Sequence, residues 1–543
     1  MKIFQRAKIF ANVFFVLFFL SCTSLTKENK VYEKPNYSEK DVFENEKKRI
    51  LKTSEKESVK ALWLSHLLGD EQTIAHCTGL VRMQYKKALS EKNYFDALKL
   101  FQSLRACGIK ESELENETET SLEKKAHADV PGTKIDKTLL PKTIDDCINA
   151  TVTVWVDRGI AIQKGIGFAD IVIGSGFFID KRGWIITNHH VIQDVVDTKN
   201  EKYSRLYIKL AKDSDTKIPA KVVGWDAILD LALLKAEVDA PVILQLGKSS
   251  DLKMGDKVSA IGTPIGLEGT LTQGIVSATN RKLFTTGSVL QIDAAVNSGN
   301  SGGPLIDENM KVQAIVFAGI MQYQGLNFAI PVEYLIQDLP FLFHGGAREH
   351  SWINAYGKTK KTKDGKKNVG LEIQYVMPGG SAHRASFEAG DVIVSLNGEK
   401  ISSLEDMQDK VRNFTSATIA NVSYLRGDEK KNELVYLAHR PINPGYEMYE
   451  SDLLSGSAIP IFGMKLISSS TLSKRTFTIQ KILTGSIADE SDFSENDPIT
   501  FSNIKFDDDK KILYASVNTR RRKKGFLDIS MLLASPLDSP YYF

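Results

Sequence analysis

Hydrophobic positions change their spacing several times along this chain, and each change marks a boundary between segments. Residues 22–56 are polar and rich in lysine, which predicts a flexible tether. Apolar residues at helical spacing begin at Ala61 and predict a helical segment over residues 57–110. The acidic stretch that follows contains few apolar residues and indicates a linker over residues 111–142.

Short strands replace helices in the middle of the chain. β-branched and aromatic residues dominate residues 148–156, and glycine turns separate short apolar runs as far as residue 345. Helical patterns are rare in this region. The pattern therefore predicts a mainly β domain over residues 143–345.

The last third of the chain contains an internal repeat. Five positions of the first copy recur in the second: Ile373, Gly380, Phe387, Asp391 and Ile393 correspond to Ile479, Gly485, Phe493, Asp497 and Ile499. The repeat predicts two related domains, over residues 346–441 and 442–543.

A glycine-rich turn in the β region carries the strongest chemical signal. Ser301 lies in Gly299-Asn300-Ser301-Gly302-Gly303, where glycines allow the tight conformation that directs backbone N–H groups inward. A nucleophilic serine needs such N–H groups to stabilise a developing oxyanion. A plain glycine turn would look the same, so the interpretation depends on partner residues elsewhere.

Two upstream motifs supply those partners. His190 follows a strand-like run and is well placed as a general base. Asp230 is embedded in an apolar run, where a carboxylate is costly unless it is paired, for example with an imidazole. Histidine, then aspartate, then serine is the order found in chymotrypsin-like enzymes.

Each partner has a neighbour that could be confused with it. His189 precedes His190, and strand alternation points the two side chains to opposite sides. Asp226 lies four residues before Asp230 without an apolar run directly around it, and we interpret it as a loop carboxylate. His190 and Asp230 are the preferred candidates.

With these motifs, residues 143–345 resemble the HtrA/Deg family of trypsin-like serine proteases, which carry PDZ domains. The matching segments are residues 174–179, 184–191, 230–234, 297–305 and 325–331. The resemblance implies two six-stranded antiparallel barrels with the active site between them. It also implies His190 as base, Asp230 as its orienting partner, Ser301 as nucleophile, and the N–H groups of Gly299 and Ser301 as the oxyanion hole.

An uncharged pocket for the substrate side chain is the next expectation. Ala295 lies six residues before Ser301, where enzymes that cut after Lys or Arg carry an aspartate. The pocket walls are expected around Val316, Ala318 and Phe328, which are also apolar. This pattern favours small or medium aliphatic side chains, as the family resemblance also implies. The alternative is that Ala295 is only a core residue.

The first copy of the repeat closely resembles the PDZ domains of HtrA proteases, which capture extended peptides by strand addition. The second copy has Asn496 where the first has Gly390, and Pro498 follows Asp497, so we expect a degenerate PDZ domain with a distorted or edge-placed strand. A loop that grips a peptide carboxylate is not obvious in the first copy. Residues 352–357 are a candidate.

The N-terminal pattern is typical of export. Basic residues precede the mostly apolar run 9–20, and Cys22 follows a small residue, so residues 1–21 read as a signal peptide. The run is short for a spanning helix. The position of Cys22 resembles a loose bacterial lipobox and predicts lipidation and membrane anchoring, with ordinary cleavage as the alternative.

The helical segment resembles a tetratricopeptide hairpin in residues 85–101, where small alanines alternate with aromatic residues. At most two repeats fit, whereas a stable solenoid needs about three. A generic helical hairpin explains the pattern equally well. We expect a helical pair that docks on the protease or on another subunit.

The cysteines and the charge balance narrow the chemistry further. Cys77 and Cys107 form the most plausible disulfide, with Cys147 left over. No metal motif is evident, and triad chemistry needs no cofactor. A net charge of +3 over 543 residues gives no reason to expect nucleic-acid binding.

The sequence therefore predicts an exported serine endopeptidase of the bacterial envelope that cleaves unfolded or damaged proteins, with PDZ-bound peptides as further partners. The family resemblance implies a homotrimer or a higher oligomer. One alternative is a proteolytically silent peptide-holding chaperone or scaffold that acts through its PDZ domains. A surface adhesin is another, permitted by the anchor and tether but supported by nothing specific.

Overall fold

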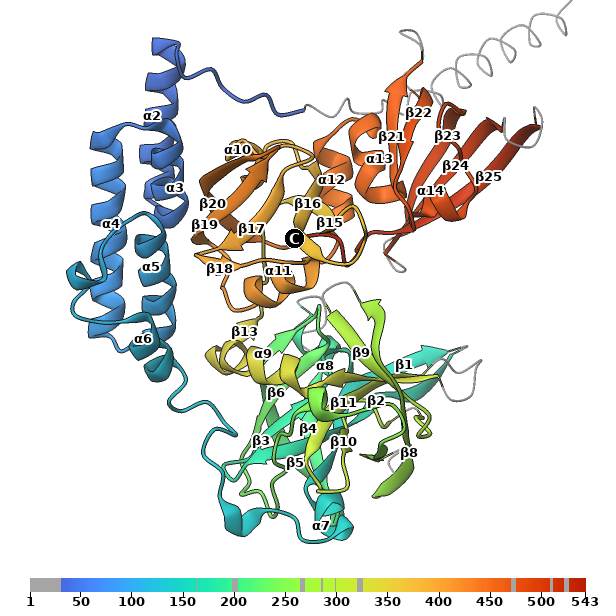
Figure 1. Cartoon of the computed structure of the whole chain (residues 1–543). Coiled ribbons are helices and arrows are strands. Elements are labelled where there is room, and N and C mark those ends of the chain that lie inside the picture. Colours follow the sequence, from blue (N-terminus) through green and yellow to red (C-terminus); the bar gives the residue numbers. More distant parts are fainter. Residues whose placement is uncertain are drawn as a thin grey trace, which may run out of the picture.

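The computed structural model describes residues 31–163, 165–197, 204–263, 269–284, 287–297, 299–319, 326–469, 475–507, 511–521 and 527–543. The chain forms a helical segment, a double-barrel domain and two smaller sheet domains (Figure 1). The mainly β fold class predicted from the sequence is confirmed. No helix in the described ranges is long and apolar enough to span a membrane.

The helical segment contains five α-helices. Their bounds are α2 Lys40–Ser54, α3 Ser58–Leu68, α4 Glu71–Ser90, α5 Tyr94–Ala106 and α6 Glu119–Ala126. Asp70 and Asn93 accept hydrogen bonds from the N–H groups of Thr73 and Asp96, and these caps fix the starts of α4 and α5. Gly69 ends α3 in the left-handed conformation, with φ of 76°.

This segment is larger than the sequence pattern indicated. Helix α2 lies in the range predicted as a tether, and Ile50 on it is fully buried. Helix α6 lies in the predicted acidic linker, where Leu114 and Leu122 enter the hydrophobic core of the helices. A few buried residues in a charged stretch are enough to anchor a helix that composition alone assigns to solvent.

The predicted Cys77–Cys107 disulfide is wrong, because both thiols are free, as is that of Cys147. Cys77 is buried on α4 and interacts with Ser65 of α3, so its sulfur is engaged on another helix. Burial raises the pKa of Cys107 and of Cys147 to about 12, which keeps both as unreactive thiols.

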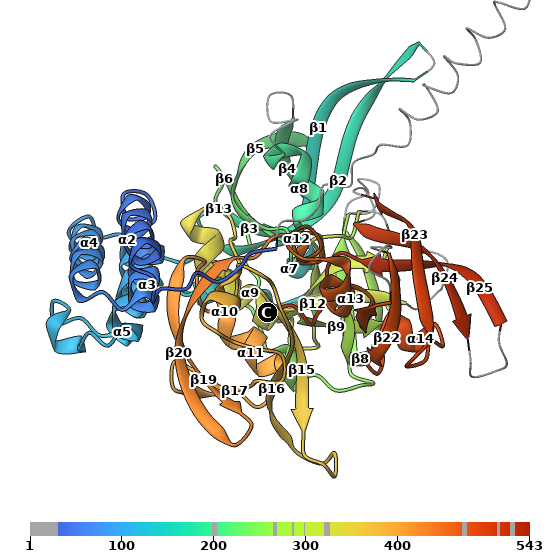
Figure 2. The ribbon, with the colours of Figure 1, turned by 90° about the horizontal axis from the view of Figure 1, so that it is seen from above.

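The helices dock on the first of the two smaller sheet domains, which covers residues predicted as a PDZ domain (Figure 2). Trp63 of α3 stacks on Tyr436 with ring centroids 5.6 Å apart, and its indole N–H donates to the Leu434 carbonyl at 2.8 Å. The two bodies share one hydrophobic cluster. The helical segment therefore completes the core of its neighbour.

The double-barrel domain begins with α7 (Ile144–Asn149). The strands of its first barrel are β1 Thr151–Gln163, β2 Ile166–Asp180, β3 Trp184–Thr187, β4 Arg205–Leu210, β5 Asp213–Asp226 and β6 Leu231–Ala236. They pair in the order β5-β4-β1-β2-β3-β6, and β5 also pairs with β6, which closes the barrel. Helix α8 (His189–Val196) follows β3.

The second barrel is closed in the order β10-β11-β12-β9-β8-β7. Its strands are β7 Lys257–Gly262, β8 Thr270–Phe284, β9 Gly287–Ile292, β10 Pro304–Ile306, β11 Val312–Gly319 and β12 Asn327–Pro331, followed by α9 Val332–His344. The two six-stranded barrels agree with the architecture that the resemblance implied.

Side-chain alternation lets single strands serve two cores. Ile185 of β3 lies inside the first barrel, whereas its neighbour Ile186 joins a cluster that also contains Leu335 of α9. Two apolar faces of the same strand therefore hold the barrels and α9 together, and they fix the position of the cleft between the barrels.

The first small domain has a sheet with the strand order β14-β20-β19-β17-β16-β15. Its elements are β14 Ser351–Trp352, β15 Ala355–Lys361, β16 Asn368–Val376, α10 Ser381–Arg384, β17 Val392–Leu396, β18 Glu399–Lys400, α11 Leu404–Val411, β19 Thr418–Arg426 and β20 Glu429–His439. A two-residue strand, β13 (Gly346–Ala347), precedes it and pairs in parallel with β5 of the first barrel.

The second small domain has a five-stranded sheet in sequence order. Its elements are α12 Pro444–Ser451, α13 Leu454–Phe462, β21 Met464–Ser468, β22 Thr476–Ile482, α14 Ile487–Glu490, β23 Pro498–Asp507, β24 Ile512–Arg521 and β25 Leu527–Pro536.

Equivalent hydrogen bonds confirm the internal repeat. The Ile373 N–H donates to the Asp391 carbonyl at 2.9 Å, and the Ile479 N–H donates to the Asp497 carbonyl at 3.0 Å. The expectation of an edge-placed strand at Pro498 is wrong, whereas the alternative expectation of a distorted strand agrees with the register shift between β23 and β24 at Phe501 and Asn503. Pro498 is the first residue of β23, an inner strand, where proline is tolerated.

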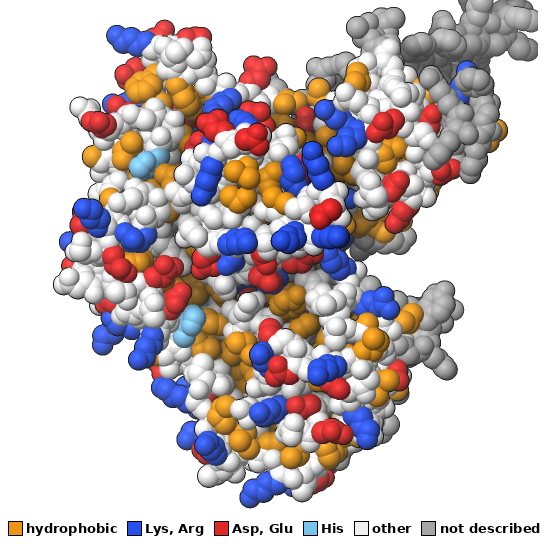
Figure 3. Space-filling view, in the orientation of Figure 1, with side chains coloured by type: hydrophobic (Ala, Val, Ile, Leu, Met, Phe, Trp, Pro, Cys, Tyr) orange, Lys and Arg blue, Asp and Glu red, His pale blue; other side chains and the backbone are white. Residues whose placement is uncertain are grey.

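The second copy does depart from the first in one element. In the first copy, α11 lies between β17 and β19, whereas in the second β23 ends at Asp507 and β24 begins at Ile512. The second copy thus has no counterpart of α11 in its described residues. The face of the molecule in Figure 3 carries basic and acidic side chains interspersed.

Replacing Trp63 with alanine tests the docking of the helices. We expect it to lower the free energy of opening of α3 and β20 by about 3–5 kcal/mol, because a buried aromatic side chain and its hydrogen bond are lost. Amide hydrogen exchange in these two elements measures the effect.

Met83→Ala on α4 is the matched control, because Met83 is 61% exposed. Equal protection of β20 in Trp63→Ala and in the wild type would show that the helices do not support the sheet.

Candidate active site

The three candidate catalytic residues lie on different elements that meet between the barrels. His190 is the second residue of α8, Asp230 directly precedes β6, and Ser301 lies in the turn between β9 and β10. Two of the residues therefore come from the first barrel and one from the second. This is the placement that the resemblance implied for His190, Asp230 and Ser301.

His190 and Asp230 form a tight pair. The Nδ1 atom of His190 lies 2.7 Å from Oδ2 of Asp230, and the backbone N–H of His190 donates to Oδ1 at 2.8 Å. Asn188 donates from Nδ2 to the Asp230 carbonyl at 2.8 Å. Oδ2 therefore holds the imidazole while Oδ1 holds the backbone of the same residue, and the Nε2 atom of the ring takes no part in this pair.

Asp230 adopts a backbone conformation that is uncommon for a residue with a side chain. Its φ is 56°, in the left-handed region that aspartate tolerates better than most residues. The conformation turns the chain at the start of β6. The carboxylate thereby points back to α8 instead of following the alternation of the strand.

The turn that carries Ser301 is packed against the first barrel. The Ser175 N–H donates to the Ser301 carbonyl at 2.8 Å, and the Ser175 hydroxyl donates to the Gly299 carbonyl at 2.6 Å. Gly302 has φ of 85°, and a Cβ atom there would lie 2.2 Å from the Ser175 carbonyl oxygen. Only glycine fits this approach, which explains the glycines of the motif.

The hydroxyl of Ser301 is not engaged by the base. Its Oγ donates to the Phe317 carbonyl at 3.3 Å, whereas a nucleophile ready to react donates to the histidine. The side chain of His190 is 43% exposed. The structure therefore contains an assembled base and a serine whose hydroxyl points elsewhere.

The predicted oxyanion donors stay a prediction. Gly299 has φ of 107°, which only glycine adopts readily, and its carbonyl is held by Ser175. These features fix the peptide before Asn300 in one orientation.

The four residues predicted for the substrate pocket stay a prediction. Ala295 is exposed, and its carbonyl accepts a hydrogen bond from the Thr272 hydroxyl. Val316 belongs to the interior of the second barrel, while Phe328 belongs to the cluster between the barrels and α9. Ala318 pairs with Phe328 along the sheet. Apolar character alone fits both a pocket wall and a barrel core at these positions.

His189 and Asp226, the neighbours of the preferred candidates, differ in how well the structure agrees with their interpretation. His189 is partly buried, and burial lowers its pKa, which agrees with a supporting position beside His190. The interpretation of Asp226 as a loop carboxylate is wrong. Asp226 ends β5, its side chain is fully buried, and Oδ2 lies 2.6 Å from Nε2 of His350.

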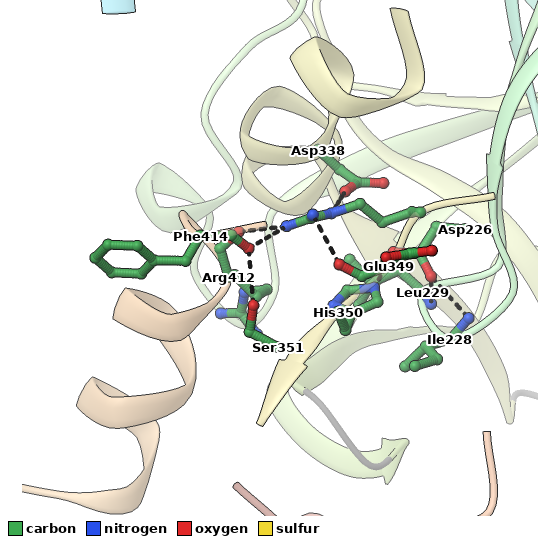
Figure 4. A network of polar contacts seen from close by, with 10 residues as sticks. Asp226, Ile228, Leu229, Asp338, Glu349, His350, Ser351, Arg412 and Phe414 are labelled. Carbon is green, nitrogen blue, oxygen red and sulfur yellow. Dashed lines mark hydrogen bonds and ion pairs between the residues drawn. The ribbon is translucent and has the colours of Figure 1, made fainter. Parts of the chain in front are cut away.

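Asp226 holds the loop that leads to Asp230. Its Oδ1 accepts the N–H groups of Ile228 at 2.7 Å and of Leu229 at 2.9 Å (Figure 4). Leu229 directly precedes Asp230. One carboxylate therefore connects the loop before Asp230 with His350, which lies on the segment leading into the first small domain.

A buried arginine completes this network. Arg348 donates from Nε to Asp338 of α9 at 3.1 Å, and from Nη2 to the carbonyls of Arg412 at 2.6 Å and Phe414 at 3.2 Å. The Arg348 and Asp338 side chains are only 2% and 4% exposed. The double-barrel domain and the first small domain are thus joined through charged groups removed from water.

The charge states in the network follow from burial and hydrogen bonding. Burial would raise the pKa of Asp226, but His350 and the two loop N–H groups outweigh it and lower the pKa to about 2. Burial lowers the pKa of His350 and outweighs the attraction of Asp226. Burial and the charge of Asp226 raise the pKa of Asp338 well above its usual range. A neutral His350 therefore donates Nε2–H to an ionised Asp226.

Sequence reasoning missed this network because its members are far apart. Asp226 and His350 are separated by 124 residues. The available signal was a carboxylate at the end of a β-branched run, in Val222-Val223-Gly224-Trp225-Asp226, which is the position of a strand end and not of an open loop.

Each of the four parts of the chain matches a known domain family. A trypsin-like peptidase domain family matches residues 174–315, and a PDZ domain family matches residues 357–436. The TP0546 family PDZ domain matches residues 445–537, and a domain of unknown function (DUF8517) matches residues 41–126. The double-barrel domain is therefore a trypsin-like peptidase domain, and the two small domains are PDZ domains.

Curated relatives match about half of the chain. A "Probable periplasmic serine endoprotease DegP-like" of Bartonella henselae is 35% identical over 292 residues, which are 52% of this chain and 56% of the relative. The protein of the same name from Pseudomonas fluorescens is 35% identical over 271 residues, 48% of this chain and 55% of the relative. The chain thus spans a little over half the length of these relatives.

Solved structures of similar proteins include the HtrA-type protease AlgW with decapeptide, with 24% identity and a TM-score of 0.46 over 55% of this chain and 99% of the neighbour. The serine endoprotease from Yersinia pestis has 28% identity and a TM-score of 0.42 over 56% of this chain and 100% of the neighbour. The domain families and the DegP-like relatives confirm the resemblance to HtrA/Deg serine proteases with PDZ domains.

Replacing His350 with asparagine tests the buried network. We expect the free energy of unfolding to fall by about 2–4 kcal/mol at pH 7, because the ionised Asp226 loses its hydrogen-bond partner. In the wild type, the folded-state pKa of His350 lies below the ordinary value of about 6.5, so the unfolded chain binds the extra proton and stability falls as pH drops from 7 to 5. The variant loses this part of the pH dependence. Thermal unfolding at both pH values measures the difference.

His76→Asn is the matched control, since His76 is exposed on α4. An unchanged slope of stability against pH in His350→Asn would contradict a neutral, buried His350.

Proposed function

We propose that this chain is a serine endopeptidase that cleaves unfolded polypeptides outside the cytoplasm. The observation that carries the proposal is the His190–Asp230 pair, held by both carboxylate oxygens and placed opposite the Ser301 turn between two barrels. The DegP-like relatives, whose names describe periplasmic serine endoproteases, support both the activity and the export.

In the proposed reaction, Ser301 attacks the scissile carbonyl and His190 takes its proton, then returns the proton to the leaving amine. Asp230 holds the imidazole in the tautomer that leaves Nε2 free to accept. The N–H groups of Gly299 and Ser301 would receive the oxyanion. The Ser301 hydroxyl must first leave the Phe317 carbonyl and turn to His190.

A preference for small or medium aliphatic residues is part of the proposal. This preference depends on the family resemblance and on Ala295. An alanine at this position offers no negative charge to bind a lysine or arginine side chain of the substrate. Lipid anchoring at Cys22 is also retained as a proposal, and that residue lies outside the described part of the chain. A trimeric or larger assembly likewise stays a prediction.

One observation favours the second candidate function, a peptide-holding scaffold that acts through the PDZ domains. The Ser301 hydroxyl is bonded to Phe317 and not to His190, which is the arrangement of a resting or silent site. The intact His190–Asp230 pair weighs against a permanently silent site, because nothing in a scaffold requires it.

Degradation of casein separates the two functions. We expect Ser301→Ala to abolish cleavage, with a loss of about 10⁶-fold, because the nucleophile is removed. Asp230→Asn should lower kcat about 10⁴-fold, because asparagine stabilises the wrong tautomer of His190. Mapping the cut sites by mass spectrometry reports the preferred side chain.

Ser250→Ala and Asp251→Asn are matched controls, since both residues are exposed and lie outside the cleft. Wild-type protein that suppresses aggregation of the substrate without cutting it, and a Ser301→Ala variant that does the same, would favour the scaffold.

A further inference from the structure

Residues 540–543 lie along the free edge of the first PDZ domain. Strand β15 is at one end of its sheet, and Tyr356 and Tyr542 form an antiparallel bridge there. Ala355 and Phe543 exchange two hydrogen bonds, at 3.2 and 3.1 Å, and the Gly357 N–H donates to the Tyr541 carbonyl at 3.0 Å. The segment therefore adds a short strand to the sheet, and Figure 1 shows this end of the chain inside the first PDZ domain, away from β25.

Side-chain contacts also hold the segment in place. Phe543 and Tyr542 are only 3% and 2% exposed. Gln408 of α11 donates from Nε2 to the Pro540 carbonyl at 2.6 Å. Gln408 and Val411 of α11 line a cavity of about 30 Å³ together with Tyr542 and Phe543. Phe543 joins the core of the first small domain, whereas Tyr542 packs with Met448 of α12 and its hydroxyl donates to the Pro460 carbonyl of α13 at 3.3 Å.

These contacts are those by which a PDZ domain takes a peptide. Strand addition supplies affinity, and the space between the edge strand and a helix supplies specificity. Here the edge strand is β15 and the helix is α11. Residues 352–357, the candidate peptide-gripping loop, provide the backbone groups that bind Tyr541 and Phe543.

The segment directly follows the second PDZ domain in the chain and is anchored by it. Strand β25 ends at Pro536, Leu537 is buried in the core of the second domain, and Asp538 pairs with Arg440 at 2.6 Å. Only a few residues separate this anchor from Tyr541. The second domain lacks a counterpart of α11 in its described residues, so its structure suits presenting a peptide better than binding one.

We propose that Tyr541–Phe543 is the resident peptide ligand of the first PDZ domain, supplied in the same chain by the second. External ligands of the same chemistry, extended peptides with two adjacent aromatic residues, enter the groove only when the resident segment leaves. A covalently tethered ligand acts at an effective concentration in the millimolar range, so it outcompetes a free peptide of equal affinity. The inference does not depend on whether Ser301 cleaves substrates.

A fluorescent peptide with the sequence of residues 535–543 tests the proposal by anisotropy. The full chain carries Ser301→Ala in every sample, so that the probe stays intact. We expect weak binding to this parent and at least about tenfold tighter binding when Tyr542→Ala and Phe543→Ala are added, because the resident segment loses its side-chain contacts.

Leu532→Ala is the matched control, because Leu532 is 63% exposed on β25 and lies outside the groove. A double variant that keeps cooperative unfolding and gains no affinity for the probe would overturn the proposal.

A disulfide provides the test that does not require removal of the segment. Ala355 and Phe543 form a hydrogen-bonded pair, so Tyr356 and Tyr542 are a non-hydrogen-bonded pair with Cα atoms about 4.5 Å apart, which suits a cross-strand disulfide. In the variant with Tyr356→Cys and Tyr542→Cys, oxidation should exclude the probe and reduction should admit it.

Two results of this experiment contradict the proposal. Failure of the disulfide to form would place residue 542 away from β15. Probe binding that is the same in the oxidised and reduced forms would show that the segment does not occupy the peptide groove.

Discussion

The burial of one carboxylate, Asp226, is the constraint on which the arrangement of this molecule depends. Asp226 has no access to water, so the loop before Asp230 and His350 must satisfy its oxygens. Its position therefore fixes Asp230, the candidate catalytic aspartate, on one side and the entry to the first PDZ domain on the other. The peptidase cleft and the peptide groove are built on opposite ends of the same polar network, with Arg412 and His350 also lining the space beside Phe543.

Local sequence signals were more informative about candidate site residues than about packing. His190, Asp230 and Ser301 could be proposed because each lies in a motif of a few adjacent residues. In the structure, Nδ1 of His190 lies 2.7 Å from Oδ2 of Asp230. The barrels were predictable from short strands and glycine turns. The orientation of the Ser301 hydroxyl was not, because it depends on the Phe317 carbonyl, which no motif specifies.

Features that depend on distant residues were missed for a physical reason. Helix α6 looks like solvent-exposed linker until Leu122 is seen in a core formed with other helices. Pro498 reads as a strand breaker, yet a first position in a strand needs no N–H donor there. Local composition indicates whether a segment tends to be buried or exposed, whereas its actual environment depends on contacts with residues elsewhere in the chain.

The first PDZ domain draws its core from three separated parts of the chain, and this has a consequence for how the protein folds. Trp63 contacts Leu434 across 371 residues, and Phe543 pairs with Ala355 from the other direction. Contacts of such sequence separation form slowly, because long loops must close first. The helices leave the ribosome before their partner exists, so Trp63 and its apolar neighbours must stay exposed until most of the chain has been made. A chain of this topology is therefore more exposed to misfolding and aggregation during synthesis than its ordinary composition indicates.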